Sequence, residues 1–466
     1  MEYISTRGRA PTLDFAGATL AGLASDGGLY LPREWPRFTP EEIAAMVGLP
    51  YAELAARVMQ PFVGDSLTPA RLLELTTLAY GRFAHAGVTP LRQLDQQHWL
   101  LELFHGPTLA FKDVALQLLG LLFEEFLARG GDPLTIVGAT SGDTGSAAID
   151  AVAGRARIDI FMLHPKGRVS EVQRRQMTTV RAPNVHNIAV EGTFDDAQAV
   201  VKRMFGDAAM TSRFAIGAVN SINWARLMAQ VVYYFAAALQ LGAPQRKVAF
   251  AVPTGNFGDV FAGYVAAQMG LPIEQLIVAT NVNDILHRAL TSGDYSAGTV
   301  TPTAAPSMDI QVSSNFERLL FDLGRRDGTA LAAQMGTFEA TKAMQLTNLQ
   351  GAGAAKLFSS ARADADQMAQ ALRWAYEHTG ELIDPHTAIG LHAARTADLP
   401  PETPVVTLAT AHPAKFGDAV ERATGQRPIL PARIGDLLER EERLVDLPGG
   451  YDAVAEYVAQ HATARG

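Results

Sequence analysis

From about residue 100 onward, short hydrophobic runs alternate with longer amphipathic stretches. The runs are rich in β-branched and other apolar residues, which indicates buried strands, and we predict these at 134–138, 158–163, 185–190, 214–219, 248–252, 276–280 and 405–409. The stretches between them carry apolar residues at helical spacing, and we predict helices at 112–128, 145–152, 195–205, 224–241 and 257–269. Strands that alternate with helices form βαβ units. The pattern therefore predicts the α/β fold class, with a mostly parallel, doubly wound sheet.

The first hundred residues have a different pattern, in which short helical periodicities are separated by turns. Helices are predicted at 40–47, 50–59 and 68–83, and the last of them opens with Thr68-Pro69, a typical helix-start pair. We therefore expect an N-terminal, mostly helical domain over residues 1–95.

The length of 466 residues exceeds what one hydrophobic core fills, since cores stop growing near about 250–300 residues. We assign a smaller α/β domain to residues 96–220 and a larger one to residues 221–466. Within the larger domain, a segment rich in Gly, Thr, Ala and Pro precedes an Ala-rich, mostly helical one, and we interpret residues 292–380 as an insertion. The strand at 405–409 is then expected to return to a sheet that begins much earlier in the chain.

Composition narrows the classes of function. The formal net charge is −9 and the pI is about 5.7, which argues against a general nucleic-acid binder, because such proteins need clustered Lys and Arg. A small anionic substrate remains compatible with this charge, since helix starts bind anions inside acidic proteins. Cysteine is absent, so disulfides, thiolate metal ligands and Cys nucleophiles are excluded, and no metal site is predicted.

The sequence also gives expectations about location. The first eight residues contain no apolar core of a signal peptide. The longest apolar stretches, at 114–123 and 231–239, are shorter than the ~20 residues that span a bilayer. We expect a cytoplasmic protein with no membrane association, and the oligomeric state stays open between a monomer and a homodimer.

Ligands of parallel sheets bind beyond the carboxyl ends of the strands, so the loops that follow the predicted strands are the first candidates for a site. The loop at 138–145 is small and carries the hydroxyl groups of Thr140, Ser141 and Thr144, which suits a carboxylate or a phosphate. A plain tight turn with a helix cap explains the same residues equally well. The loop lacks the Lys of a Walker A motif and the spacing of a dinucleotide fingerprint, so neither nucleotide class is supported.

A second candidate loop lies at 253–259, directly after a predicted strand. Gly255 and Gly258 flank Asn256-Phe257, which would let successive N–H groups converge on one phosphate. A turn is again the alternative. However, a Phe between glycines at a helix start has no obvious capping purpose, so the pattern favours the anion site.

The third candidate segment covers residues 407–416 and follows the last predicted strand. Thr410 is positioned to donate or accept a hydrogen bond just beyond that strand. His412 alone is more typical of a solvated loop than of a catalytic base. Lys415 could neutralise an anion, or it could simply lie on the surface.

Seven lysines occur in the chain, and one differs from the rest. Lys112 follows Phe111 and opens a strongly apolar helix, so it is expected to be half-buried. Burial disfavours the charged ammonium and lowers the pKa below the usual ~10.4, as an imine-forming lysine requires. The alternative is a helix-end lysine that reaches to water, and the residues alone favour that alternative somewhat.

Five segments resemble the threonine synthase family of pyridoxal-phosphate enzymes, which has the tryptophan-synthase-β-like fold with two α/β domains. They are FHGPTLAFKD at 104–113, ATSGDTG at 139–145, NSINWAR at 220–226, PTGNFGD at 253–259 and LATAHPAKF at 408–416. The segments at 3–8 and 25–32 are also similar to the opening of that family. Each motif alone is weak, but their common order along the chain is highly specific.

The resemblance implies a pyridoxal 5′-phosphate cofactor held as a Schiff base by Lys112, which would also move protons at the substrate's α and β carbons. Thr410 would hydrogen-bond the pyridine nitrogen, and Phe111 would pack by the cofactor ring. The cofactor phosphate would be held by Gly255, Asn256, Phe257, Gly258 and Asp259. Some relatives carry Asn where this chain has Asp259, and an acid would repel phosphate, so Asp259 is expected to act through its backbone N–H.

The resemblance also implies a substrate site. The substrate's carboxylate end would be held by Thr140, Ser141, Asp143 and Thr144. Its phosphate would be held by residues drawn from Asn220, Ser221, Asn223, Arg226 and Lys415. Arg226 could equally be an ordinary helix-surface residue.

The implied reaction converts O-phospho-L-homoserine and water into L-threonine and phosphate, by γ-elimination followed by β-addition of water. A phospholyase or dehydratase that releases a 2-oxo acid is the nearest alternative. A non-catalytic relative is a further alternative, which an intact Lys112 and an intact 255–259 loop argue against. A nicotinamide dehydrogenase is disfavoured because the chain lacks a dinucleotide fingerprint.

Overall fold

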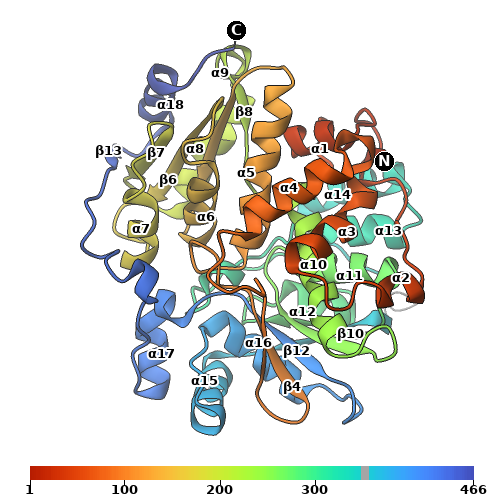
Figure 1. The fold of residues 1–466 in the computed structure, drawn as a ribbon. Coiled ribbons are helices and arrows are strands. Elements are labelled where there is room, and N and C mark those ends of the chain that lie inside the picture. Colours follow the sequence, from red (N-terminus) through yellow and green to blue (C-terminus); the bar gives the residue numbers. More distant parts are fainter. Residues whose placement is uncertain (348–355, 466) are drawn as a thin grey trace. The chain divides into compact units, whose positions relative to one another are not determined.

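The computed structural model describes residues 1–347 and 356–465, and their contacts group into two compact units (Figure 1). The larger unit comprises residues 1–18, 23–111 and 221–429. The smaller unit comprises residues 19–22, 112–220 and 430–466. Part of the predicted insertion, residues 348–355, lies outside the described residues. The three-domain division stays a prediction.

A six-stranded sheet forms the centre of the larger unit, in the order β11-β10-β9-β12-β4-β3. All neighbouring strands are parallel except β3, which is antiparallel to β4. The bounds are β3 (Leu91–Gln93), β4 (His98–Glu102), β9 (Val248–Pro253), β10 (Ile273–Thr280), β11 (Phe358–Arg362) and β12 (Val405–Ala409). β12 lies between β9 and β4, which confirms that this late strand returns to a sheet begun much earlier.

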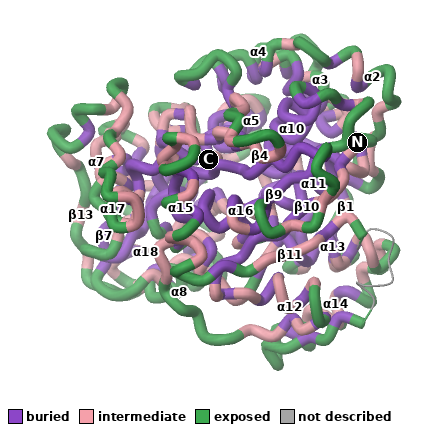
Figure 2. Tube along the Cα trace, turned by 90° about the horizontal axis from the view of Figure 1, so that it is seen from below, coloured by how far each residue is buried: buried purple, intermediate pink, exposed green. Residues whose placement is uncertain are grey.

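Helices cover this sheet because β9 and β12 are buried along their whole length and need apolar partners on both faces. One core cluster joins the sheet to the helix α16 through Ala249, Ile277, Ile389 and Val405. In Figure 2 the central strands and α10 are almost continuously buried. The helices are α10 (Trp224–Gln240), α11 (Gly258–Gln268), α12 (Ile285–Ser292), α13 (Phe316–Leu323), α14 (Gly328–Thr341), α15 (Ala365–Thr379), α16 (Pro385–Thr396) and α17 (Gly417–Thr424).

The N-terminal region is mostly helical, as predicted. A short antiparallel pair, β1 (Tyr3–Ser5) with β2 (Tyr30–Pro32), accompanies α1 (Phe15–Ala21), α2 (Pro40–Ala44), α3 (Tyr51–Val63) and α4 (Pro69–Tyr80). Thr68 caps α4 by accepting the N–H of Arg71, which confirms the helix start read from Thr68-Pro69.

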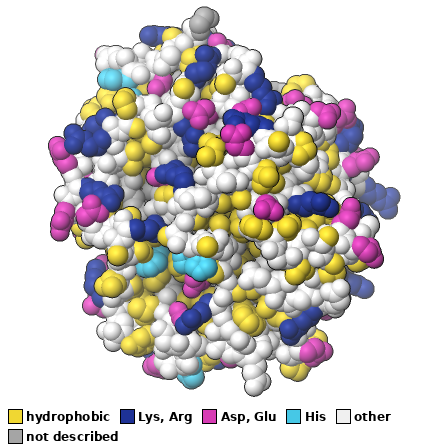
Figure 3. Space-filling model, in the orientation of Figure 1, with side chains coloured by type: hydrophobic (Ala, Val, Ile, Leu, Met, Phe, Trp, Pro, Cys, Tyr) yellow, Lys and Arg dark blue, Asp and Glu magenta, His cyan; other side chains and the backbone are white. Residues whose placement is uncertain are grey.

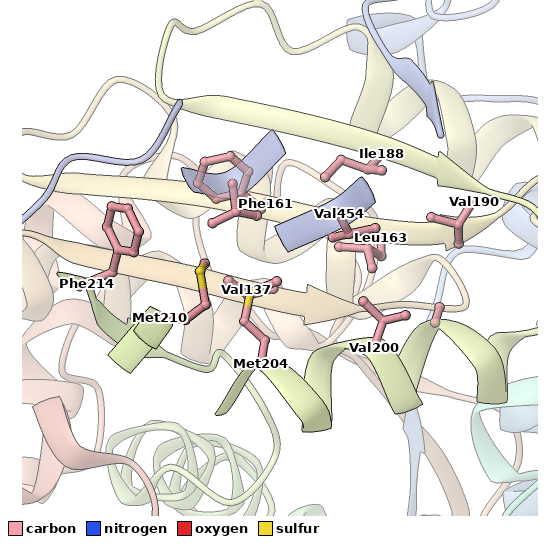
Figure 4. Close-up of a cluster of buried hydrophobic side chains, with 12 residues drawn as sticks. Val137, Phe161, Leu163, Ile188, Val190, Val200, Met204, Met210, Phe214 and Val454 are labelled. Carbon is pink, nitrogen blue, oxygen red and sulfur yellow. The ribbon is translucent and has the colours of Figure 1, made fainter. Parts of the chain in front are cut away.

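The smaller unit is built on a five-stranded, fully parallel sheet in the order β13-β7-β6-β5-β8. Figure 4 shows its core, where Val137 and Phe161 of the sheet meet Met204 and Val454 of the helices on one face. The strands are β5 (Leu134–Ala139), β6 (Ile158–Pro165), β7 (Val185–Val190), β8 (Ala215–Gly217) and β13 (Val445–Leu447). The helices are α5 (Lys112–Ala128), α6 (Asp143–Val152), α7 (Glu171–Thr178), α8 (Phe194–Gly206), α9 (Ala208–Arg213) and α18 (Tyr451–His461).

The α/β class and the parallel, doubly wound sheets predicted from the hydrophobic pattern are thus confirmed. Within the described residues, no helix is both long enough and apolar enough to cross a bilayer. On the face drawn in Figure 3, acidic and basic side chains are interspersed.

Candidate active site

Lys112 is the first residue of α5 and only 8% of its surface is exposed. Within the smaller unit, its Nζ lies 3.6 Å from Oδ2 of Asp143. The other oxygen of Asp143 accepts a hydrogen bond of 2.8 Å from Nε2 of Gln173, which fixes the carboxylate. The lysine is therefore buried beside a fixed acid and does not extend into water.

The 138–145 loop is held by its own hydrogen bonds. Oγ1 of Thr140 accepts the N–H groups of Gly142 and Gly145, at 3.0 and 2.9 Å, and so shapes the turn into α6. Gly145 cannot carry a side chain, because a Cβ there would lie 2.4 Å from Cγ2 of Thr140. Ser141 is exposed and Thr144 is half-buried at the start of the helix. The oxygen of Thr140 is thus committed to the loop, whereas its hydroxyl hydrogen can still be donated to a ligand.

The 253–259 loop of the larger unit ends at α11, and its conformation is unusual. Phe257 is the N-cap residue of α11 with φ of 62°, in the left-handed region that non-glycine residues rarely adopt. Its buried ring packs against the ring of Phe316, with centroids 5.1 Å apart. The core therefore holds the side chain while the backbone turns. The N-cap makes no side-chain hydrogen bond. The start of a helix favours anions through its N–H groups and its dipole, so the geometry is compatible with the anion site predicted from the sequence.

Neighbouring segments hold the same loop from outside. Oγ of Ser313 donates to the carbonyl of Gly255 at 2.8 Å. Nδ2 of Asn315 donates to the carbonyls of Asn256 and Ser221, at 3.0 and 3.1 Å. Asn315 therefore ties the 253–259 loop to the 220–226 segment.

Gly255 is packed too tightly for any side chain, and this leads to a first prediction. A Cβ at Gly255 would lie 2.5 Å from the carbonyl oxygen of Ser307, so Gly255→Ala must displace the loop. Overpacking of this kind costs about 1–3 kcal/mol. If the loop holds the phosphate of pyridoxal phosphate, as the resemblance implies, binding of that cofactor should weaken roughly 5- to 150-fold. Titration of the cofactor-free protein measures this change. Gly336→Ala is the control, because a Cβ there meets nothing within 4 Å, and its affinity should equal that of the wild type.

The carboxylate of Asp259 is engaged by two buried tyrosines of α10. The hydroxyl of Tyr234 donates to Oδ1 and to the carbonyl of Asp259, at 3.1 and 2.9 Å, and the hydroxyl of Tyr233 also donates to Oδ1. Burial and the nearby charge of Asp259 raise the pKa of both tyrosines well above its usual range, so both stay protonated donors. The Oδ1 atom of Asp259 is therefore engaged with α10, and a role of its backbone N–H toward a ligand stays a prediction.

Thr410 follows β12 and is fixed by its backbone. Its carbonyl accepts the N–H of Phe111 at 2.8 Å, and its own N–H donates to Oγ1 of Thr387 at 3.3 Å. Its side-chain hydroxyl has no hydrogen-bond partner among the described residues, although only 6% of the residue is exposed. Phe111, whose N–H is bound by the carbonyl of Thr410, directly precedes Lys112 in the chain.

His412 and Lys415 of this segment both have structural contacts. Nδ1 of His412 accepts the N–H of Ala414 at 3.2 Å and caps a short 3₁₀ turn. Lys415 is 2% exposed, and its Nζ donates to the carbonyl of Thr108 at 2.9 Å. The surface location considered for Lys415 is therefore wrong.

Arg226 is the unusual residue of the 220–226 segment. Asn223 caps α10 by accepting the N–H of Ala225 at 3.0 Å, and Arg226 is the third residue of the helix, in its first turn. Only 3% of Arg226 is exposed, so the helix-surface alternative is wrong. Among the described residues, Nε and Nη1 of Arg226 have no hydrogen-bond partner. Burial lowers its pKa to about 10, so it is still charged at neutral pH and suits an anionic ligand.

Sequence reasoning missed two groups of buried polar residues near these loops. Arg318 donates to the carbonyls of Tyr30 and Ile222 and ties α13 to the start of α10. The second group is Asp384, His386 and Thr387 at the start of α16. His386 contacts Ser307, which packs against Gly255, and Thr387 contacts Thr410. The only signal for the second group was the pair Asp384-Pro385, which is also a routine helix start.

Three family models match the chain in sequence order. They are "Threonine synthase N terminus" at residues 2–80, "Pyridoxal-phosphate dependent enzyme" at 83–363 and "Threonine synthase, C-terminal" at 387–458. A threonine synthase of Pseudomonas aeruginosa is 57% identical over 99% of this chain and 98% of its own length. This chain belongs to the threonine synthase family.

Solved structures of threonine synthases have the same fold as this chain. The pyridoxal-phosphate-bound threonine synthase of Brucella melitensis has a TM-score of 0.96 and 52% identity, with both chains covered completely. The yeast threonine synthase has a TM-score of 0.94 and 39% identity, covering 99% of this chain and 98% of that one.

The residues of this member of the threonine synthase family fit pyridoxal phosphate, which the family model implies. The start of α11 has no side-chain cap, and the loop before it passes so close to the carbonyl of Ser307 that Gly255 cannot carry a Cβ. Thr410 offers a hydroxyl with no partner among the described residues, and Lys112 is a buried amine. Each group that the cofactor needs has a counterpart in the chain.

Proposed function

We propose that this protein converts O-phospho-L-homoserine and water into L-threonine and phosphate, as a pyridoxal-phosphate-dependent lyase of threonine biosynthesis. The observation that carries the proposal is the match to both the N-terminal and the C-terminal threonine synthase models, at residues 2–80 and 387–458. The model for residues 83–363 describes pyridoxal-phosphate enzymes in general and alone would support only the cofactor class.

The chain's own residues would divide the work as follows. Pyridoxal phosphate supplies an electron sink that stabilises negative charge at the reacting carbons of the substrate. Lys112 would hold the cofactor and carry protons to and from the α and β carbons. Thr410 would donate or accept a hydrogen bond at the ring nitrogen, and the N–H groups of residues 255–259 would bind the cofactor phosphate. Phe111 would pack beside the ring.

The amino-acid end of the substrate would be bound by the 140–144 loop. The hydroxyl groups of Ser141 and Thr144 lie at the start of α6, where the helix dipole favours a carboxylate. Thr140 would contribute mainly by keeping the loop in shape, since its oxygen accepts two backbone N–H groups. Asp143 would act on Lys112, because its carboxylate lies 3.6 Å from the amine.

The substrate phosphate would be bound around Arg226. A buried guanidinium with unused N–H groups is charged and preorganised, which suits an anion with several acceptor oxygens. The same site would reject unphosphorylated homoserine, because that ligand leaves the guanidinium without a partner. Asn220, Ser221, Asn223 and Lys415 would complete this region. Asn223 already caps α10, and Lys415 already donates to the carbonyl of Thr108, so we propose a supporting role for both.

A product assay tests the proposal. Purified protein loaded with pyridoxal phosphate should release threonine and inorganic phosphate in equal amounts from O-phospho-L-homoserine, and neither from L-homoserine. If the loaded protein instead forms 2-oxobutyrate and ammonia, the reaction is that of a phospholyase and the proposal fails. The cytoplasmic location remains a prediction that fractionation of cells can check.

A further inference from the structure

The start of α16 contains a fully buried carboxylate that is linked, through His386 and Thr387, to two parts of the proposed cofactor site. Asp384 is 0% exposed and is the N-cap residue of α16. Its Oδ1 accepts the backbone N–H of His386 at 2.9 Å and lies 2.7 Å from Nδ1 of the same histidine. Its Oδ2 accepts the N–H of Thr387 at 3.3 Å and also the hydroxyl of Thr387. Capping alone needs only one of these oxygens.

The first arm from Asp384 leads to the cradle expected to bind the cofactor phosphate. Nε2 of His386 accepts the N–H of Ser307 at 3.3 Å, which requires that this nitrogen carry no proton. The proton of the neutral ring is then on Nδ1, where Asp384 accepts it. The carbonyl of Ser307 in turn occupies the space where a Cβ of Gly255 would lie. Asp384 therefore fixes the histidine tautomer that holds this turn against the 253–259 loop.

The second arm leads to the residue expected to face the ring nitrogen. Thr387 donates its hydroxyl hydrogen to Asp384, so its oxygen remains an acceptor, and the N–H of Thr410 donates to that oxygen at 3.3 Å. The carbonyl of Thr410 accepts the N–H of Phe111, the residue before Lys112. The orientation of the Thr410 backbone thus depends on a hydroxyl that Asp384 orients.

We propose that Asp384 is a positioning residue that sets both ends of the cofactor site, the phosphate cradle through His386 and Ser307 and the ring-nitrogen partner through Thr387 and Thr410. The inference rests on the proposed function, since it assigns these two ends to pyridoxal phosphate. An Asn at position 384 has one acceptor oxygen and one NH₂ donor, so it can satisfy one arm while it opposes the other. Asp384→Asn should therefore disturb the cofactor more than it disturbs the helix, because Asn is as good an N-cap as Asp.

The test uses the full chain with pyridoxal phosphate and reads each end of the cofactor separately. The ³¹P resonance of the bound cofactor reports the phosphate end, and its visible absorbance spectrum reports the ring. We expect His386→Phe to shift the phosphorus resonance, Thr387→Val to shift the absorbance spectrum and Asp384→Asn to shift both. We also expect each variant to bind the cofactor about tenfold more weakly. This is the lower end of the loss of affinity seen at metal sites when a residue that orients a ligand is removed.

Asp364→Asn is the matched control, because Asp364 is the N-cap of α15 in the same unit and accepts the N–H of Gln367 at 2.9 Å. It should change neither signal. If Asp384→Asn lowers the thermal stability of the cofactor-free protein but leaves affinity and both spectra like those of Asp364→Asn, then Asp384 is only a cap and the inference is overturned. If Asp384→Asn does not fold, the two single-arm variants decide in the same way. A wild type that binds no pyridoxal phosphate would overturn the proposed function, and this inference with it.

Discussion

Lys112→Ala is expected to remove threonine formation and, with it, the visible absorbance of lysine-bound pyridoxal phosphate. Lys112 is the buried amine at the start of α5, and its Nζ lies 3.6 Å from Asp143. Loss of one positioned acid–base group typically lowers a rate by about 10²–10⁴-fold, and loss of the covalent attachment adds to that. Absorbance scans and initial rates with O-phospho-L-homoserine measure both effects.

Lys202→Ala is the matched control for this prediction, because Lys202 is exposed on α8 and its substitution removes the same charge. It should keep the absorbance band and the rate. A small primary amine such as methylamine should restore part of the activity of Lys112→Ala, which a purely structural lysine would not allow. If Lys112→Ala keeps the band and a rate within a few-fold of the wild type, Lys112 is not the cofactor lysine.

The central strands could be predicted from the sequence because burial on both faces leaves an unbroken apolar run. β7 and β12 match the predicted ranges, and β5, β6, β8, β9 and β10 overlap theirs. The two edge strands of the larger sheet were not predicted. β11 has the sequence FSSAR and lies within the predicted insertion, and β3 has the sequence LRQ, so neither shows a strand pattern. Their pairing with β10 and β4, which sequence alone does not reveal, makes them strands.

Of the candidate site, only the loops that follow predicted strands could be recognised from the sequence. The glycines of the 253–259 loop predict an anion site, but the left-handed φ of Phe257 and its ring contact with Phe316 are results of packing. The burial of Arg226 could not be predicted from the sequence either, since an arginine in the first turn of a helix is ordinarily exposed. Nearly every residue of α10 is buried, and this depends on what the fold places around the helix.

Substitution of Arg226 should affect stability and activity in different ways. Nε and Nη1 of Arg226 have no partner among the described residues, so in the free protein these two buried polar groups are not compensated by hydrogen bonds. Arg226→Met keeps the length and apolar stem of the side chain and removes the charge. We expect its melting temperature without ligands to be equal to or higher than that of the wild type, because replacing unpaired buried charge is neutral or stabilising. At the same time kcat/KM should fall about 10- to 100-fold, mainly through KM.

Arg318→Met is the matched contrast, because both arginines are buried in the larger unit. Arg318 donates to the carbonyl oxygens of Tyr30 and Ile222, so its loss leaves buried acceptors unpaired and should cost roughly 3 kcal/mol of stability. Inorganic phosphate should also separate the two sites. At 100 times its Kd, phosphate stabilises a protein by about 2.7 kcal/mol, and Arg226→Met should lose most of that increment. If Arg226→Met instead unfolds as easily as Arg318→Met and keeps the wild-type response to phosphate, then Arg226 has a structural partner and does not bind the substrate phosphate.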